Sequence, residues 1–206
     1  MSIDLLAAPT LTGERVRLEP LAPRHVADLT RSAAEERSTY DYTVVPDGAT
    51  AMAAYVDALV ADRDAGSAVP FAQVRAADGV AIGATRLWSF RFRPGAELPC
   101  SVEIGGTWLA ASAQRTGINT EAKLLLFTHA FETWNVERVE LRTDARNTRS
   151  RDAIAGVGAA FEGVLRKWQP SHVVGEGRLL RDSAMFSVLD TEWPQVARDL
   201  RARLSP

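Results

Sequence analysis

The segment that begins at Gln114 has residue types and a spacing that could bind a phosphate group. Its first residues are Gln114-Arg115-Thr116-Gly117-Ile118-Asn119, and an apolar helix pattern without Pro or Gly follows from Glu121 to Phe131. A strand, residues 102–109, precedes it. A strand, a glycine turn and a helix N-terminus together present unpaired backbone N–H groups and the positive end of a helix dipole, which suit a pyrophosphate. An ordinary strand-to-helix turn has the same pattern, so both interpretations stand.

This loop differs from two common nucleotide-binding motifs. It lacks the G-x-G-x-x-G spacing of dinucleotide-binding folds and the G-K-[ST] ending of a P-loop. The pattern therefore disfavours NAD and ATP as ligands.

The composition is that of an ordinary soluble globular domain, with 46% hydrophobic and 24% charged residues among 206. We expect one domain spanning residues 1–206. The net charge of -2 gives no general attraction to nucleic acid or to an anionic membrane. The N-terminus has no signal-type pattern and no apolar run is long enough for a bilayer. We therefore expect a cytoplasmic protein with small-molecule partners, and no nucleic acid or membrane partner.

Cysteine and histidine are scarce. The single cysteine, Cys100, excludes an intramolecular disulfide and lacks a nearby sign of activation. The histidines are His25, His129 and His172, and their spacing shows no metal-ligand pattern. We expect chemistry without a metal, and we expect His129 to be a core residue with a hydrogen-bond partner.

The rest of the chain predicts a mixed α/β fold. We expect strands at 14–20, 71–75, 80–90, 101–109, 138–143, 161–168 and 179–189, and helices from Pro23, at 50–64, at 147–157 and at 192–204, besides the central helix. Consecutive strands with short Gly/Pro turns imply an antiparallel meander, and the order implies helices on both faces of one sheet. Tyr40 and Tyr42 lie in a loop between helices, where they either line a ligand site or pack on the core.

Four features in this order resemble one known family. The loop Gln114-x-x-Gly117-x-Asn119 is similar to the [RQ]-x-x-G-x-[GA] acetyl-CoA loop of the GNAT superfamily of N-acetyltransferases. The segment 11–18, the pair Asn147-x-x-Ser150 before Gly158, and Glu162-Gly163 are similar to its RimJ/RimL branch. The resemblance covers residues 11–193. It implies a single-domain, mostly antiparallel twisted sheet flanked by helices, with acetyl-CoA as co-substrate.

The resemblance implies a role for residues on the strand before the loop. Glu103 would be the general base, acting through a water, and partial burial would raise its pKa toward the working range. Its alternative is a surface glutamate on the polar face of the strand. A backbone N–H near Trp108 and Leu109 would meet the thioester carbonyl, as an oxyanion donor does.

The start of the helix at 147 has two interpretations. Asn and Ser are favoured helix caps, so Asn147 and Ser150 fit a purely structural role. The resemblance implies instead that Asn147 hydrogen-bonds the pantetheine arm and that Ser150 protonates the departing coenzyme A thiolate.

Two positions depart from the pattern of the family. Asn119 stands where Gly or Ala is usual, so its side chain would either crowd the phosphates or donate to them. Gly106 stands where the branch commonly has an aromatic residue, and it would border the acceptor pocket. Trp88, Trp108, Tyr40 and Tyr42 would then wall that pocket.

The resemblance implies an N-acetyltransferase that moves an acetyl group from acetyl-CoA to a primary amine by direct attack in a ternary complex. The acceptor is a small molecule or a protein N-terminus. The alternatives are a non-catalytic acyl-CoA sensor and an interaction domain on the same fold, because fold does not fix function. The sequence leaves a homodimer open.

Overall fold

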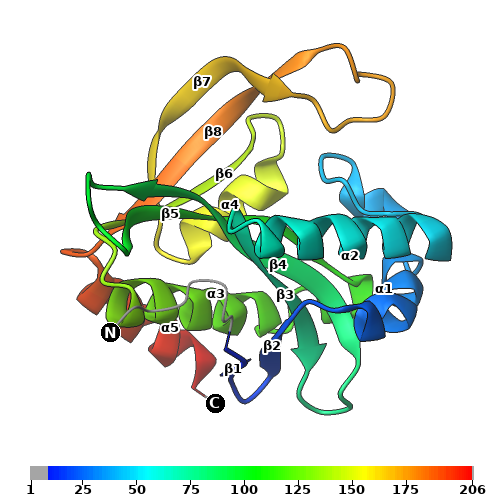
Figure 1. Cartoon of the computed structure of the whole chain (residues 1–206), viewed down its shortest axis with the longest axis horizontal. Coiled ribbons are helices and arrows are strands. Elements are labelled where there is room, and N and C mark those ends of the chain that lie inside the picture. The colour runs from blue at the N-terminus through cyan, green and yellow to red at the C-terminus, as the bar shows by residue number, and fades with distance from the viewer. Residues whose placement is uncertain (1–8, 206) are drawn as a thin grey trace.

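A computed structural model describes residues 9–205 and contains one eight-stranded sheet with the order β1-β2-β3-β4-β5-β6-β8-β7 (Figure 1). The strands are β1 (Leu11–Thr12), β2 (Val16–Pro20), β3 (Ala68–Arg75), β4 (Ala81–Phe92), β5 (Pro99–Leu109), β6 (Arg138–Asp144), β7 (Ala160–Pro170) and β8 (Leu180–Leu189). Neighbouring strands are antiparallel, except for the parallel pair β5 and β6. The predicted antiparallel meander is β3 to β5.

Helices cover both faces of the sheet. They are α1 (Val26–Ala33), α2 (Ala49–Asp64), α3 (Ile118–Thr128), α4 (Thr148–Gly156) and α5 (Trp193–Leu204). In Figure 1, α1 and α2 lie on one side of the central strands and α3 and α5 on the other. This arrangement confirms the predicted α/β fold. Within residues 9–205, no helix is both long and apolar enough to cross a membrane.

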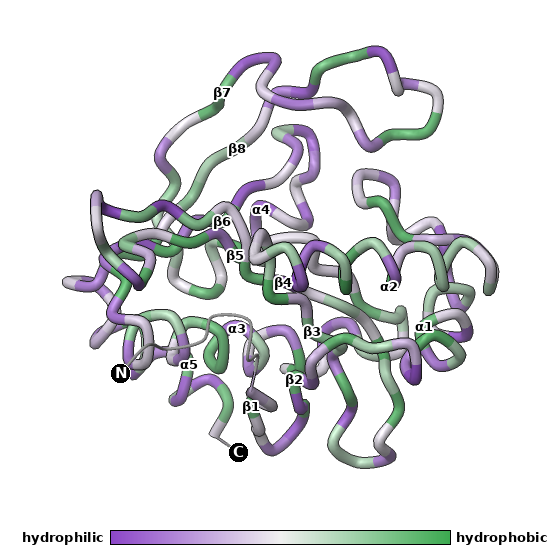
Figure 2. The backbone as a smooth tube through the Cα atoms, in the orientation of Figure 1, coloured by the Kyte–Doolittle hydropathy of each residue, from purple (hydrophilic) through white to green (hydrophobic). Residues whose placement is uncertain are grey.

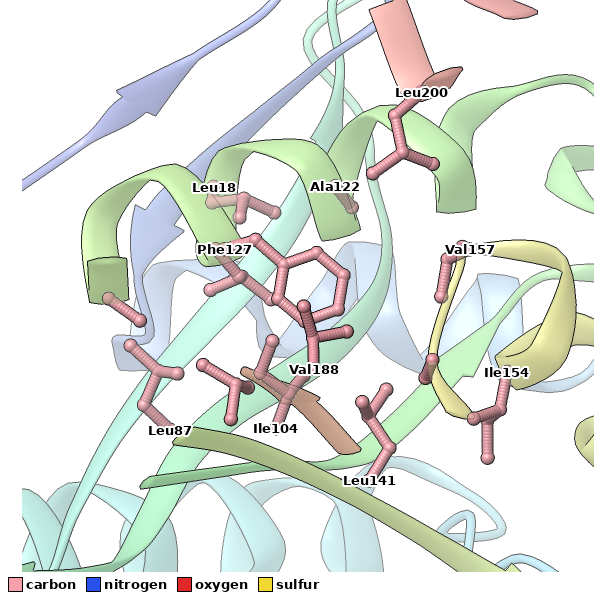
Figure 3. Close-up of a cluster of buried hydrophobic side chains, with 14 of the residues drawn as sticks. Leu18, Leu87, Ile104, Ala122, Phe127, Leu141, Ile154, Val157, Val188 and Leu200 are labelled. Atoms are coloured by element: carbon pink, nitrogen blue, oxygen red, sulfur yellow. The ribbon is translucent and has the colours of Figure 1, made fainter. Parts of the chain in front are cut away.

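Two apolar clusters form the core, one on each side of the sheet. The larger joins the sheet to α3, α4 and α5, and Figure 3 shows Phe127 at its centre, between Leu18 and Val188. The smaller joins α1 and α2 to the opposite face. Figure 2 shows hydrophobic and hydrophilic positions alternating along helices and strands, as expected for elements with one buried face. A fully buried side chain such as Phe127 contributes about 2–3 kcal/mol.

Three local features differ from the sequence-based expectation. The strand β3 begins at Ala68 and includes Pro70. Proline has no N–H to donate, but only the carbonyl of Pro70 is used at this position, where it accepts from Leu21 N at 3.0 Å. The strand β4 continues two residues beyond Phe90. The central helix changes to a π-helical turn at His129–Thr133, a form that periodicity does not distinguish from an α-helix.

Candidate active site

The site is a cavity that opens where two neighbouring strands separate. The parallel strands β5 and β6 are paired only from Ser101 to Glu103 and from Arg138 to Glu140, although both continue beyond these residues. A cavity of about 780 Å³ lies along the unpaired parts and reaches the N-termini of α3 and α4. This volume is typical of a ligand pocket.

A bulge in β5 sets the directions of its side chains at this point. Two steps along β4, from Ala84 to Arg86, oppose three steps along β5, from Gly105 to Trp108. Gly106 has a φ of +59°, which favours glycine. Because of the extra residue, Trp108 joins the apolar cluster on the α1 and α2 side, whereas Ile104 belongs to the cluster under α3.

Most of the sequence-predicted site residues line this one cavity. They are Tyr40, Tyr42, Trp88, Glu103, Gly106, Trp108, Leu109, Gln114, Arg115, Gly117, Asn119, Asn147 and Ser150. Thr116 and Ile118 do not line it: the Thr116 hydroxyl donates to Ala113 O at 2.7 Å, and the Ile118 side chain is buried in the core. Only their backbone groups are left for a phosphate contact, which stays a prediction.

Glu103 is a buried carboxylate in the cavity wall, 2% exposed, and not a surface glutamate. Its Oε2 lies 3.0 Å from Arg142 Nη2 in an ion pair. Burial raises the pKa of Glu103 to about 7, although the charge of Arg142 acts in the opposite direction. A carboxyl with a pKa near neutrality can accept and return a proton at physiological pH.

The N-terminus of α3 faces the cavity without a side-chain cap. Gly117 is the N-cap in the left-handed conformation, with a φ of +85°. In the described part of the chain, the N–H groups of the first turn therefore have no side-chain acceptor. Arg115, Arg149 and Arg203 also line the cavity. Free N–H groups, a helix dipole and guanidinium groups are the donors that phosphates prefer, so these residues fit the diphosphate part of coenzyme A.

The first turn of α4 has the side-chain cap that the structural interpretation of Asn147 and Ser150 predicts. Asn147 is the N-cap, and its Oδ1 accepts from Ser150 N at 3.0 Å. Both residues nevertheless line the cavity. The cap uses the amide oxygen of Asn147 and leaves its NH₂ group as a donor. A structural and a ligand-binding role are therefore compatible, and the second stays a prediction.

Tyr40 combines the two roles considered for the loop tyrosines. Its hydroxyl donates to Leu109 O at 3.0 Å, and its ring packs edge-on against Trp108 at 6.1 Å between centroids. Tyr40 thereby fixes the end of β5, where the oxyanion donor is expected. Tyr42 lies at the cavity with the Arg146 guanidinium 5.5 Å from its ring centroid.

Sequence reasoning missed several cavity residues. Among them are Tyr55, Arg86, Thr107, Lys123, Arg142, His172 and Arg181. Lys123 is 4% exposed, donates to Thr107 Oγ1 at 2.8 Å, and has a pKa that burial lowers to about 7. A lysine that interrupts the apolar run of α3 was the available signal.

Two other residues stand apart from the site. His129 is buried and packs against Trp134 at 4.7 Å between ring centroids, as a core histidine does. Among the described residues, its Nε2 has no hydrogen-bond partner, which differs from our expectation. Cys100 is half-buried and its thiol donates to Arg91 O at 3.3 Å.

Comparison with known proteins identifies the family. A family model described as the acetyltransferase (GNAT) domain matches residues 15–160, which is more than half of the chain. The chain therefore belongs to the GNAT acetyltransferase family. A search of curated proteins finds no match.

Solved structures of the family share the fold over nearly the whole chain. A GCN5-related N-acetyltransferase from Brucella melitensis is 29% identical, with a TM-score of 0.80 over 97% of this chain and 86% of that one. RimJ of Mycobacterium smegmatis, in complex with a CoA disulfide, is 25% identical, with a TM-score of 0.79 over 96% of both chains. RimL, a ribosomal L7/L12 α-N-protein acetyltransferase in complex with coenzyme A, is 14% identical, with a TM-score of 0.70 over 88% of this chain and 98% of that one. The fold is thus RimJ- and RimL-like.

Proposed function

We propose that this protein transfers an acetyl group from acetyl-CoA to a primary amine, with direct attack of the amine in a ternary complex. The observation that carries the proposal is the buried Glu103, with a pKa of about 7, in the same cavity as the uncapped N-terminus of α3. One group suits proton removal at neutral pH, and the other suits a diphosphate. The family match supports the same reaction class.

The chain supplies binding, orientation and proton transfer. Gly117 and the backbone after it hold the diphosphate, with Arg115, Arg149 and Arg203 around it. The amide of Asn147 holds the pantetheine arm. The bound thioester supplies the activated acetyl group, and positioning two reactants in one cavity accounts for much of the rate.

Proton transfer would use residues on two sides of the cavity. Glu103 removes one proton of the acceptor ammonium through a water before the attack. The Ser150 hydroxyl donates a proton to the departing thiolate and regains one from the acceptor nitrogen, which loses its second proton as the amide forms. A backbone N–H near Leu109 stabilises the negative charge on the carbonyl oxygen. The hydrogen bond from Tyr40 to Leu109 O keeps that part of the backbone in place.

The test is thiol release from acetyl-CoA with a panel of primary amines and N-terminal peptides. We expect release that depends on the amine, together with stabilisation of the protein by coenzyme A in thermal unfolding. Stabilisation without amine-dependent release would support a non-catalytic acyl-CoA sensor instead. Neither effect would favour an interaction domain.

A substitution at Gly106 can test the size of the acceptor pocket. Arg86 lies against this glycine, since a Cβ placed there would be 3.2 Å from Arg86 Nε. We propose that the absence of a side chain lets Arg86 lie beside Gly106 and leaves the rest of the pocket open to an acceptor that is bulky near its amine. Gly106→Tyr should raise KM for the best bulky amine and spare acetyl-CoA binding. Equal turnover of that amine by both proteins would overturn this part of the proposal.

A further inference from the structure

The part of the cavity around Glu103 contains more positive than negative charge. Arg86 from β4, Arg142 from β6 and Arg181 from β8 all line it. Two of them make cation–π contacts with the Trp88 ring: the guanidinium of Arg86 lies 4.1 Å from the ring centroid, and the guanidinium of Arg142 lies 5.2 Å from it. Three guanidinium groups thus approach the expected acceptor site from three strands.

Among residues 9–205, only one of these three arginines has a close buried carboxylate. Arg142 pairs with Glu103 at 3.0 Å. Arg86 has Asp62 at 3.9 Å, but that carboxylate is half exposed, and the buried Nε of Arg86 has no hydrogen-bond partner within residues 9–205. A buried donor without a partner is costly, unless a ligand supplies the acceptor.

Arg181 is more deeply buried than Arg86, with 8% of the residue exposed. Its Nη1 lies 3.5 Å from His172 Nδ1, and its guanidinium lies against the Gln169 amide. Neither partner is an anion. Asp144, whose charge also acts on Arg181, is already paired with Arg146 at 2.8 Å. The positive charge of Arg181 is therefore left for something else in the cavity.

The charges of the same three arginines act on the pKa of His172. Burial lowers its pKa, and the charges of Arg181, Arg86 and Arg142 lower it further. The ring is therefore neutral at pH 7 and adds no charge, but its pKa responds to all three guanidinium groups. His172 and the three arginines all line the same cavity.

An acceptor with only an ammonium group would enter this region against a net positive charge. A guanidinium group binds a carboxylate with two parallel, charge-assisted hydrogen bonds. We propose that the acceptor carries a carboxylate near its amine, and that Arg86 and Arg181 bind this carboxylate while the amine lies at Glu103. The inference rests on the proposed acetyl transfer and adds the substrate class. Free amino acids and peptides with an acidic first residue share this chemistry.

The test compares each carboxylate with its neutral amide in the thiol-release assay. One arm uses free α-amino acids against their α-carboxamides, and the other uses a peptide that begins with aspartate against one that begins with asparagine. We expect kcat/KM to be about 10- to 100-fold higher for the carboxylate in at least one arm. The arm that shows the preference identifies the source of the carboxylate.

Arginine variants locate the preference in the structure. Arg86→Gln and Arg181→Gln should each reduce the ratio between carboxylate and amide by about 10-fold, and Arg86→Lys, which keeps the charge, should retain part of it. Arg198→Gln is the matched control: it removes the same charge from α5, outside the cavity, and should keep the ratio of the wild type.

The outcomes separate this inference from the function on which it rests. Equal kcat/KM for carboxylates and amides in the wild type would overturn the inference and leave acetyl transfer intact. A preference that persists in both Arg86→Gln and Arg181→Gln would overturn the assignment of these residues. Absence of thiol release with every amine would contradict the proposed function, and the inference would fail with it.

Discussion

Opposing effects determine the protonation of Glu103. Its desolvation in the wall of the cavity favours the neutral acid, while Arg142 at 3.0 Å favours the carboxylate. Desolvation is the larger effect, so the pKa rises to about 7. A side chain in this state is half ionised at neutral pH, as the general base of an amine acetylation needs to be.

The rate of the enzyme should report this pKa. We expect kcat/KM of the wild type to rise with pH through an apparent pKa near 7, because the base acts when ionised. Glu103→Gln should lose roughly 100-fold in kcat/KM and keep its affinity for coenzyme A in calorimetry. If the variant keeps the profile of the wild type, the proton is removed by another group.

The Glu103 carboxyl should also make the stability of the fold depend on pH, and its raised pKa determines the sign of this dependence. Because the folded pKa lies above the ordinary glutamate value of 4.5, the native state binds a proton more tightly than the unfolded chain between these two pH values. The contribution of Glu103 to stability therefore falls as pH rises from about 4.5 to 7. Glu103→Gln removes this loss.

Urea unfolding of both proteins at pH 5 and pH 8 measures this effect. The free energy of unfolding of Glu103→Gln, relative to the wild type, should increase by about 2–3 kcal/mol from pH 5 to pH 8. A difference between the two proteins that does not change with pH would mean that Glu103 titrates normally.

At the scale of elements, α3 is the unit that joins the core, the N-terminal strands and the cavity. Its Glu121 carboxylate is 7% exposed and accepts from three backbone N–H groups, those of Glu14 at 3.0 Å, Arg15 at 2.7 Å and Val16 at 2.8 Å. These bonds fix the helix against the start of β2, and so they also position its N-terminus at the cavity.

Removal of this anchor should destabilise the fold. Glu121→Ala leaves three N–H groups without their acceptor, and we expect a loss of about 3–5 kcal/mol in the free energy of unfolding. Glu97→Ala, at an exposed glutamate in the turn between β4 and β5, is the control and should change stability by less than about 0.5 kcal/mol. A similar small effect for both variants would contradict the anchoring role.

The N-terminus of α3 can be tested with a matched pair of glycines. Gly117→Ala introduces a side chain at a φ of +85°, and Gly79→Ala does so at +74° in the turn between β3 and β4. Each should cost about 1–2 kcal/mol of stability. Only Gly117→Ala should also weaken coenzyme A binding, measured by calorimetry. Wild-type affinity in that variant would argue against a phosphate site at this helix.

The parts of the fold that were predicted from sequence are those in which apolar residues recur with a clear period. The meander, the central helix and the helices on both faces follow from apolar spacing and Gly/Pro turns. The bulge at Gly106 and the π-helical turn after α3 leave no periodic signal, because each changes the chain by a single residue or turn. Pro70 hid the start of β3 because proline normally ends a strand prediction.

The site was predictable in part for a similar reason. The loop 114–119 has a local pattern, but Arg86, Arg142 and Arg181 come from three strands far apart in sequence. On an alternating strand, an arginine at a polar position is typical of a solvent-facing side. Their meeting in one cavity depends on the order of β4, β6 and β8 in the sheet, which alternation alone does not specify.

At the scale of the whole molecule, the proposed reaction uses one cavity for two substrates. The separation of β5 from β6 opens it, and α3 and α4 contribute their N-termini. The diphosphate and the acceptor would then approach along the same opening and meet beside Glu103. This arrangement predicts direct transfer, in which no acetylated form of the protein is needed.

Mass spectrometry of a single turnover tests this central claim most directly. The protein is mixed with acetyl-CoA, first alone and then with the amine that gives the fastest thiol release. We expect an unchanged protein mass in the first mixture, and in the second one acetylated amine for each coenzyme A released, at a rate that Glu103→Gln reduces roughly 100-fold. Release of coenzyme A without acetylated amine, or an acetylated protein that transfers its group to the amine, would contradict the account.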